Sequence, residues 1–250
     1  MYIKSDFFWY NYIGDDSMKE FFCNKRNKTC LIGIVVFTIY SFTTLLKGVP
    51  LSWLDIKENN ETILLLYSLV VSILLIGVIT FIYKDKLKLK YEDLKKNHKK
   101  YFSNSLKYWL FALIFMALSN LVILTFMESN LPTNEKIIRS FFGSNPIIVF
   151  ASAVIVAPIL EELVFRQGFR DMFSGNLMFI FMSSFTFGAF HVVSNANALI
   201  DFVYIIPYAI PAIAFGLMLK ETDNIFVPMG FHLLHNGILI ALQFAILIFG

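Results

Sequence analysis

The stretch TILLLYSLVVSILLIGVITFIY fills residues 62–83 and contains no acidic or basic side chain. A helix that crosses about 30 Å of hydrocarbon needs roughly 20 residues of this kind. Four further runs lack acids and bases: 108–127, 141–160, 202–218 and 225–250. These runs predict an all-α fold, namely a polytopic bundle of transmembrane helices.

The composition of the whole chain supports this fold class. Of 250 residues, 57% are apolar and 16% are charged, whereas soluble domains carry about a quarter charged residues. Such a chain cannot cover its own surface with polar groups, so the lipid bilayer is its expected surroundings. A cytosolic enzyme, a secreted disulfide scaffold and a nucleic-acid binder are excluded.

Hydrophobicity and charge together predict about seven spans, within a range of six to eight. We expect a cytoplasmic N-terminal tail (1–29), anchoring spans (30–145) with a basic cytoplasmic loop at 84–107, and a helical core (146–250). Prolines in the sixth span can kink or break it. The seven predicted spans are 30–46, 62–83, 108–127, 146–169, 176–193, 200–219 and 225–249.

Basic residues predict the orientation. Lysine and arginine accumulate in cytoplasmic loops of membrane proteins. Seventeen of the 21 lie in four alternate segments: the N-terminal tail, residues 84–107, the end of the fourth span and the start of the last connection. The other four lie in the intervening loops. We therefore expect a multi-pass protein of the cell membrane with a cytoplasmic N-terminus.

Ionisable residues interrupt the last spans. The fourth span ends with Glu161, Glu162 and Arg166, the fifth contains His191, and the last opens with His232. A charged side chain at the centre of a membrane helix costs on the order of 2.5–3.5 kcal/mol, and such groups pair or line polar cavities. Three spans with such groups indicate a functional site.

Helical spacing suggests partners within each span. Glu162 and Arg166 lie four residues apart, so they share a face and can pair. Glu161 points about 100° away and has no cation on its own helix, which leaves its carboxylate available for chemistry. The same spacing places Phe187 next to His191, and His232 next to Asn236.

The depths of these groups agree. A turn near Ser174 and Gly175 would make the fourth and fifth spans a hairpin, with Glu161 and His191 within about one helical turn of each other. We expect Glu161, His191, His232 and Asn236 to meet between the cytoplasmic half and the middle of the bilayer. Proton or cation transport, and binding without turnover, also use buried carboxylates and imidazoles.

Three motifs in chain order carry a family resemblance. EExxxR at 161–166, FxxxH at 187–191 and HxxxN at 232–236 resemble the CPBP family, as does the stretch 215–225. This family comprises the type II CAAX prenyl endopeptidases and their bacterial relatives, the bacteriocin-processing or Abi proteins. The resemblance covers about 146–250 and implies an intramembrane endopeptidase that cleaves a peptide or a membrane-tethered protein.

The resemblance also implies roles for individual residues. Glu161 would be the general base for the attacking water, and His191 would assist it. His232 and Asn236 would stabilise the oxyanion. The supporting residues would be Glu162, Arg166 and Phe187.

Family members are described both as metalloproteases and as glutamate proteases. Glu161, His191 and His232 could supply an open three-ligand Zn²⁺ site, or they could act without a metal. We favour a site with no tightly held metal.

A second class of function stays open. A non-catalytic membrane scaffold, or a bacteriocin self-immunity protein that binds a peptide partner, would keep the same fold. The chain is rich in Phe, Ile, Asn and Lys, which suggests an AT-rich bacterium, and such a cell lacks prenylated CAAX substrates. The basic segment 84–100 could bind anionic lipid or nucleic acid, but we expect it to be a solvated cytoplasmic linker.

Overall fold

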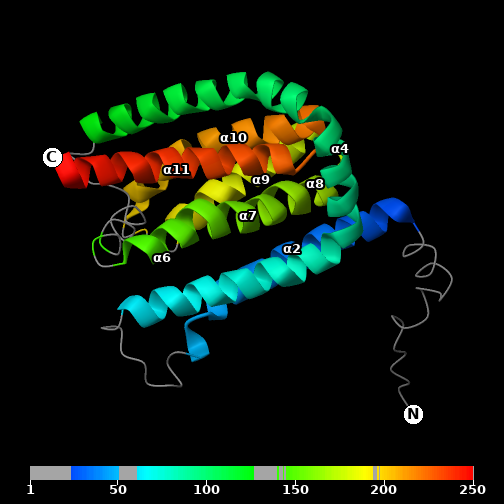
Figure 1. Ribbon diagram of the computed structural model, residues 1–250, viewed down its shortest axis with the longest axis horizontal. Helices are drawn as coiled ribbons and strands as arrows, with labels where there is room; N and C mark the ends of the chain where they lie inside the picture. Colours follow the sequence, from blue (N-terminus) through cyan, green and yellow to red (C-terminus); the bar gives the residue numbers. More distant parts are fainter. Residues whose placement is uncertain are drawn as a thin grey trace, which may run out of the picture.

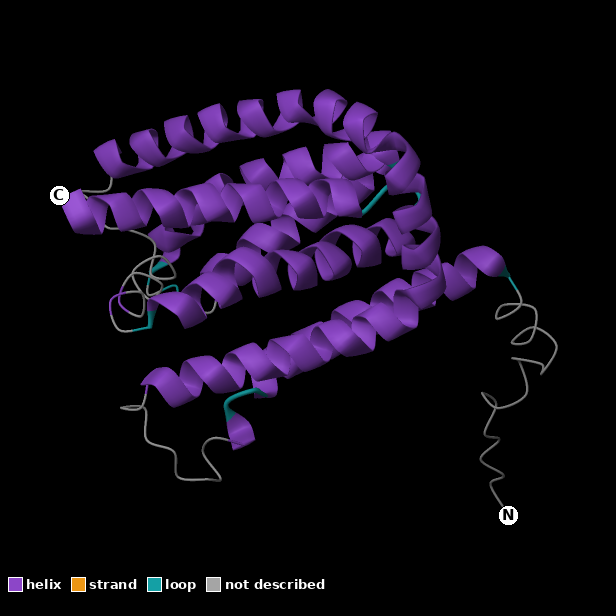
Figure 2. Ribbon diagram, in the orientation of Figure 1, coloured by secondary structure: helices purple, strands orange, loops and turns teal. Residues whose placement is uncertain are grey.

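The computed structural model describes residues 24–50, 61–126, 140, 143, 145–193, 196 and 198–249, and all the elements in these ranges are helical (Figures 1 and 2). The all-α prediction is confirmed for this part of the chain. The longer helices are α2 (Lys25–Leu46), α4 (Glu61–Phe126), α9 (Asn176–Val192), α10 (Ile205–Thr222) and α11 (Phe226–Phe249). A composite rod consists of α6 (Pro146–Phe150), η1 (Ala151–Val156), α7 (Ala157–Glu161), η2 (Glu162–Gly168) and α8 (Phe169–Met172).

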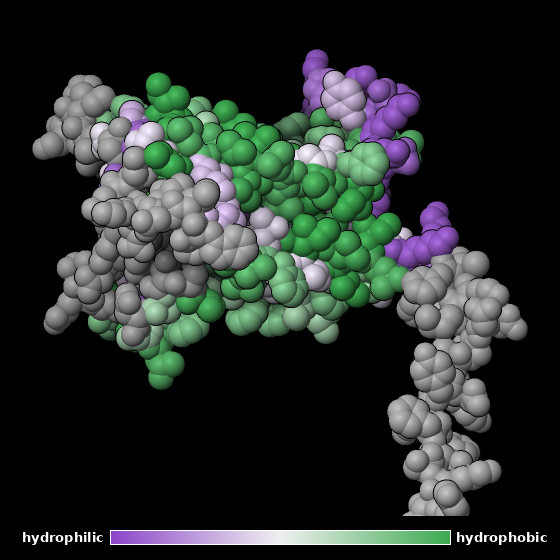
Figure 3. Space-filling view, turned by 90° about the horizontal axis from the view of Figure 1, so that it is seen from below, coloured by the Kyte–Doolittle hydropathy of each residue, from purple (hydrophilic) through white to green (hydrophobic). Residues whose placement is uncertain are grey.

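Five stretches among these residues are long and apolar enough to cross a membrane: α2, α4, the rod Pro146–Met172, the stretch Leu199–Thr222 and the α11 portion Phe226–Ala245. The shorter helix α9 is apolar too. Large apolar side chains such as Leu45, Phe81 and Phe126 face outward, and the surface view shows an apolar band with a hydrophilic cap at one end (Figure 3). The chain is a multi-pass membrane protein, while the count of seven spans stays a prediction.

Helix α4 differs from expectation, because the predicted loop at 84–107 is helical. Its 66 residues form one continuous helix that curves so that its two apolar arms run back along the bundle (Figure 1). Lysine, leucine and glutamate favour helix, and Lys95 pairs with Glu92 across one turn (Nζ–Oε1 2.9 Å). High local helix propensity therefore turns a charged connection into helix.

The rod contains two π-helical segments, η1 and η2, on either side of the α7 turn that carries Glu161. Pro158 has no backbone N–H and cannot donate to the carbonyl of Val154. The widened turns of η1 lie directly before this proline. Such π-helical turns are frequent at functional sites.

The sixth predicted span is not broken by its prolines. It begins as a 3₁₀ turn, η4 (Leu199–Tyr204), and continues without interruption into α10, which contains Pro211. Helix α10 packs mainly against α9 and α4.

The main apolar core lies between the rod and its neighbours and includes Phe165 of the rod with Phe179 and Phe187 of α9.

The connection from α10 to α11 is anchored on α4. Asp223 ends α10 in the left-handed conformation (φ 48°), and the buried Asn224 donates to the Lys90 carbonyl (2.7 Å) and to Asp93 Oδ2 (2.9 Å). This hydrogen bond from Asn224 is the main reason why the pKa of Asp93 lies below its usual range. The ionised carboxylate therefore holds the start of α11 at a fixed height.

The contact between α2 and the rod depends on a glycine. A Cβ on Gly33 would overlap the carbonyl oxygen of Gly168 and lie 2.9 Å from Met172 Cγ. We predict that Gly33→Ala lowers the free energy of unfolding by about 1–3 kcal/mol, as overpacked sites do. Denaturation of the purified protein in detergent would measure it. Gly77→Ala is the matched control, because nothing lies within 4 Å of that position; equal stability of the two variants would contradict the prediction.

Candidate active site

Three of the four predicted catalytic residues meet at Glu161. This residue ends α7, while His191 lies in the last turns of α9 and His232 near the start of α11. His191 Nε2 is 3.8 Å from Glu161 Oε1, and His232 Nε2 is 3.6 Å from Glu161 Oε2. The Glu161 side chain keeps 14% of its surface exposed, so the carboxylate is shielded but can still be reached.

His191 is oriented by its own helix. Its Nδ1 lies 2.9 Å from the carbonyl oxygen of Phe187, and a carbonyl oxygen only accepts hydrogen bonds. We therefore assign the Nδ1 proton, so that in neutral His191 the lone pair is on Nε2 and faces Glu161. The imidazole is held between Tyr208, stacked at 4.7 Å, and Phe187 at 4.4 Å between ring centroids.

His232 is oriented by Glu162. Its Nδ1 is 2.9 Å from Glu162 Oε1, and both residues are buried. Phe215 stacks on the imidazole at 4.7 Å. A carboxylate on Nδ1 fixes the ring and leaves Nε2 directed at Glu161.

The second oxygen of Glu162 serves Arg166. Arg166 Nε lies 3.5 Å from Glu162 Oε2, and neither side chain has any exposed surface. The guanidinium carbon lies 4.7 Å from the ring centroid of Phe187 and 5.6 Å from that of Phe215. Glu162 thus bridges a guanidinium and an imidazole from a distant helix. Sequence spacing suggested only the Arg166 contact, since nothing local in the sequence reveals a partner 70 residues away.

Asn236 binds the rod. Its Nδ2 donates to the carbonyl of Ala153 in η1 at 2.8 Å, so it joins α11 to the widened turns before Glu161. A primary amide has a second N–H, and its predicted oxyanion role stays a prediction. Asn224, which sets the height of α11, was not among the predicted site residues. An Asn directly before an apolar run is a helix-cap signal, and its Oδ1 accepts a hydrogen bond from the Phe226 N–H at 3.2 Å.

The predicted three-ligand metal set of Glu161, His191 and His232 stays a prediction. The two imidazoles approach different oxygens of Glu161, and the part of the chain that the structure describes contains no group of three or more His, Cys, Asp or Glu arranged to hold a metal ion. We therefore derive no catalytic step through a metal.

The family match follows the same residues. A model of the family described as type II CAAX prenyl endopeptidase Rce1-like matches residues 143–238. Over this segment, which is less than half of the chain, the match supports a protease of the CPBP family. No curated protein and no solved structure matches the chain.

The Rce1-like segment begins just before α6 and ends within α11, so it contains Glu161, His191, His232 and Asn236. Helices α2 and α4 lie outside it and pack around it. Because the Rce1-like family is a protease family, the match supports a peptidase.

The buried pair within the Rce1-like segment can be tested by stability. Arg166→Met leaves the Glu162 carboxylate buried without its cation. Glu162→Gln leaves the Arg166 guanidinium buried without its anion. Either change should cost about 3–5 kcal/mol of unfolding free energy. The double variant should cost less than the sum of the two, because it removes both charges.

Chemical denaturation in detergent measures this cycle. The control is the exposed pair Glu92 and Lys95, for which Glu92→Gln and Lys95→Met should leave stability unchanged. Additive losses in the Glu162 and Arg166 variants would show that the two side chains are not coupled.

Proposed function

We propose that this protein is an intramembrane endopeptidase in which Glu161 activates water to cleave a peptide or membrane-tethered protein. The observation that supports the proposal is the approach of two imidazole Nε2 atoms to one shielded carboxylate within a segment that matches a protease family. A structural carboxylate would need neither partial access to solvent nor two histidines with their Nδ1 atoms already engaged.

The hydrolytic step follows from general acid–base chemistry. Glu161 accepts a proton from water while the water oxygen attacks the scissile carbonyl carbon. The protonated Glu161 then gives that proton to the departing amine as the carbon–nitrogen bond breaks. The Nε2 lone pair of His191 can accept a hydrogen bond from the same water and orient it, which is the usual help that a positioned base receives.

His232 suits the oxyanion. With Nδ1–H donated to Glu162, protonation of Nε2 gives an imidazolium whose second N–H can stabilise developing negative charge. Glu162 would stabilise this cation, and Arg166 lies beside the second oxygen of Glu162. The burial of His232 and Glu162 strengthens both interactions, because little water competes for them.

Glu161→Gln tests the mechanism. This variant keeps the size of the side chain but cannot accept the proton, so we expect cleavage to fall by about 10²–10⁴-fold or more. Peptides from membranes and medium of cells with equal levels of wild type and variant would be compared by mass spectrometry. Products found only with the wild type would identify the substrate as well.

Glu92→Gln is the matched control, because that carboxylate is exposed on α4. It should give the wild-type peptide pattern. Identical peptide patterns for wild type and Glu161→Gln, with any cellular phenotype retained, would instead support the non-catalytic scaffold or self-immunity protein.

Metal removal tests the proposed chemistry separately. We predict that the purified enzyme keeps its activity after dialysis against a strong Zn²⁺ chelator, because the proposed base is the carboxylate itself. The assay is cleavage of the peptide identified above, before and after dialysis. Loss of activity that Zn²⁺ restores would contradict the metal-free mechanism while leaving the peptidase activity in place.

A further inference from the structure

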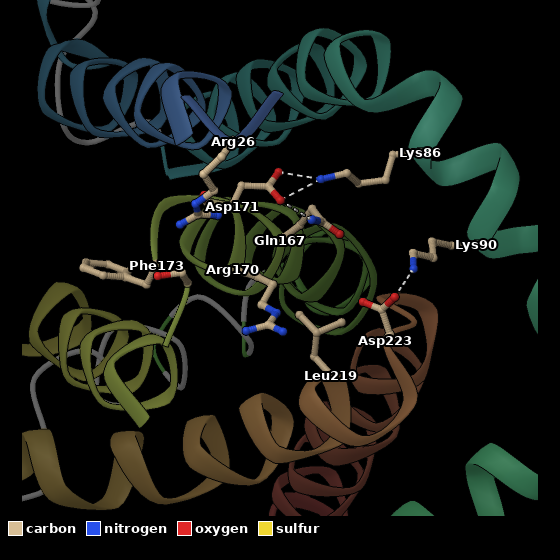
Figure 4. Close-up of a pocket in the computed structure, with 10 residues that line it drawn as sticks. Arg26, Lys86, Lys90, Gln167, Arg170, Asp171, Phe173, Leu219 and Asp223 are labelled. Atoms are coloured by element: carbon tan, nitrogen blue, oxygen red, sulfur yellow. Dashed lines mark hydrogen bonds and ion pairs between the residues drawn. The ribbon is translucent and has the colours of Figure 1, made fainter. Parts of the chain in front are cut away.

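A charged cavity lies at the end of the bundle where α2 begins, α4 bends, and α8 and α10 end (Figure 4). Its volume is about 400 Å³, which falls in the usual range for small-ligand sites. It is separate from the candidate active site, since Arg170 lies roughly 13 Å along the rod from Glu161 at helical rise. The charged residues of its lining are Arg26, Lys86, Lys90, Arg170, Asp171 and Asp223.

Both acidic groups of the lining are already neutralised by lysines. Lys86 Nζ is 2.6 Å from Asp171 Oδ1, and Lys90 Nζ is 2.6 Å from Asp223 Oδ2. Figure 4 shows the two pairs on the α4 side of the cavity. The lysine and aspartate charges therefore cancel, and any net charge in the cavity comes from the arginines.

The two arginines are held in place by neutral partners. Arg26 donates from Nη1 to the Asp171 carbonyl (3.0 Å) and from Nη2 to the Met172 carbonyl (2.8 Å). Arg170 donates from Nη1 to Asn176 Oδ1 (2.8 Å), and its guanidinium carbon lies 5.6 Å from the ring centroid of Phe179. Within the described ranges, neither guanidinium has a carboxylate partner.

Among the described residues of the lining, these contacts leave an excess of two positive charges with unused donors. A guanidinium carries five N–H groups, and Arg170 uses only one of them for a hydrogen bond in the described part of the chain. The side chain of Arg170 points into the middle of the cavity (Figure 4). Planar guanidinium donors match the oxygens of a phosphate group in pairs.

We propose that this cavity binds a phosphate group, carried by the headgroup of an anionic membrane lipid or supplied as free phosphate. Its position favours the lipid. The apolar run 62–83 ends just before Lys86, and the hydrophilic cap meets the apolar band at this end of the molecule (Figure 3). Basic pockets between membrane helices at the cytoplasmic interface commonly hold anionic headgroups.

The test measures lipid retention by the purified full-length protein. Protein in neutral detergent is mixed with phosphatidylglycerol or phosphatidylcholine, and bound lipid is counted by native mass spectrometry. We expect wild type to retain phosphatidylglycerol over phosphatidylcholine, and Arg170→Gln to weaken this retention about tenfold. Lys99→Gln is the matched control, because Lys99 is an exposed cation on α4 outside the cavity.

Two further arms make each outcome decisive. Arg170→Lys keeps the positive charge but lacks the planar guanidinium, so it should lose part of the phosphatidylglycerol retention. This variant replaces Arg170→Gln in the test if Arg170→Gln does not fold. A second outcome is that inorganic phosphate raises the melting temperature of wild type but not of Arg170→Gln, and that the wild type shows no preference between the lipids. This outcome would support a phosphate site whose ligand is soluble phosphate rather than a lipid. Equal retention and equal melting shifts in wild type and Arg170→Gln, or an equal loss in Lys99→Gln, would overturn the proposal.

Discussion

The arrangement of the core depends on one fully buried carboxylate. A glutamate inside an apolar bundle is tolerated only when it is paired with partners of suitable charge or hydrogen-bonding capacity. Glu162 finds Arg166 on its own helix and His232 on α11. The last helix is thereby fixed against the rod, and the His232 ring can take one orientation only. Phe187 and Phe215 complete the enclosure, because each contacts both the guanidinium and the His232 ring.

Helices outside the Rce1-like segment contribute to this arrangement. Helix α2 approaches the rod closely because Gly33 has no side chain. In the described contacts, α4 makes no hydrogen bond to Glu161. Its Asp93 side chain and its Lys90 carbonyl nevertheless accept hydrogen bonds from Asn224, which lies just before the start of α11. The depth of His232 relative to Glu161 is thus set partly by the helical connection 84–107 of the anchoring region.

Charge is handled differently at two levels of the molecule. Around Glu162 the charge of the guanidinium is paired within the core, because an unpaired buried charge would be too costly in a medium of low polarity. At the cavity near Arg170 two guanidiniums contact only neutral partners among the residues that the structure describes. In the proposed lipid site, water and headgroups reach that level, so an excess of positive charge is tolerable there and is available to an anion.

The sequence by itself determined the membrane character, the helical fold class and the residues of the candidate site. Uncharged runs the length of a bilayer permit only helices, and the spacing of Glu162 and Arg166 permits pairing on one turn. It also indicated the family, from motifs that the family model matches at 143–238. The tertiary structure alone decided that 84–107 is helical, that Glu162 orients His232, that Asn236 binds Ala153, and that two arginines share a cavity. These features depend on contacts between residues far apart in the chain, and helical periodicity describes only neighbours within a few residues.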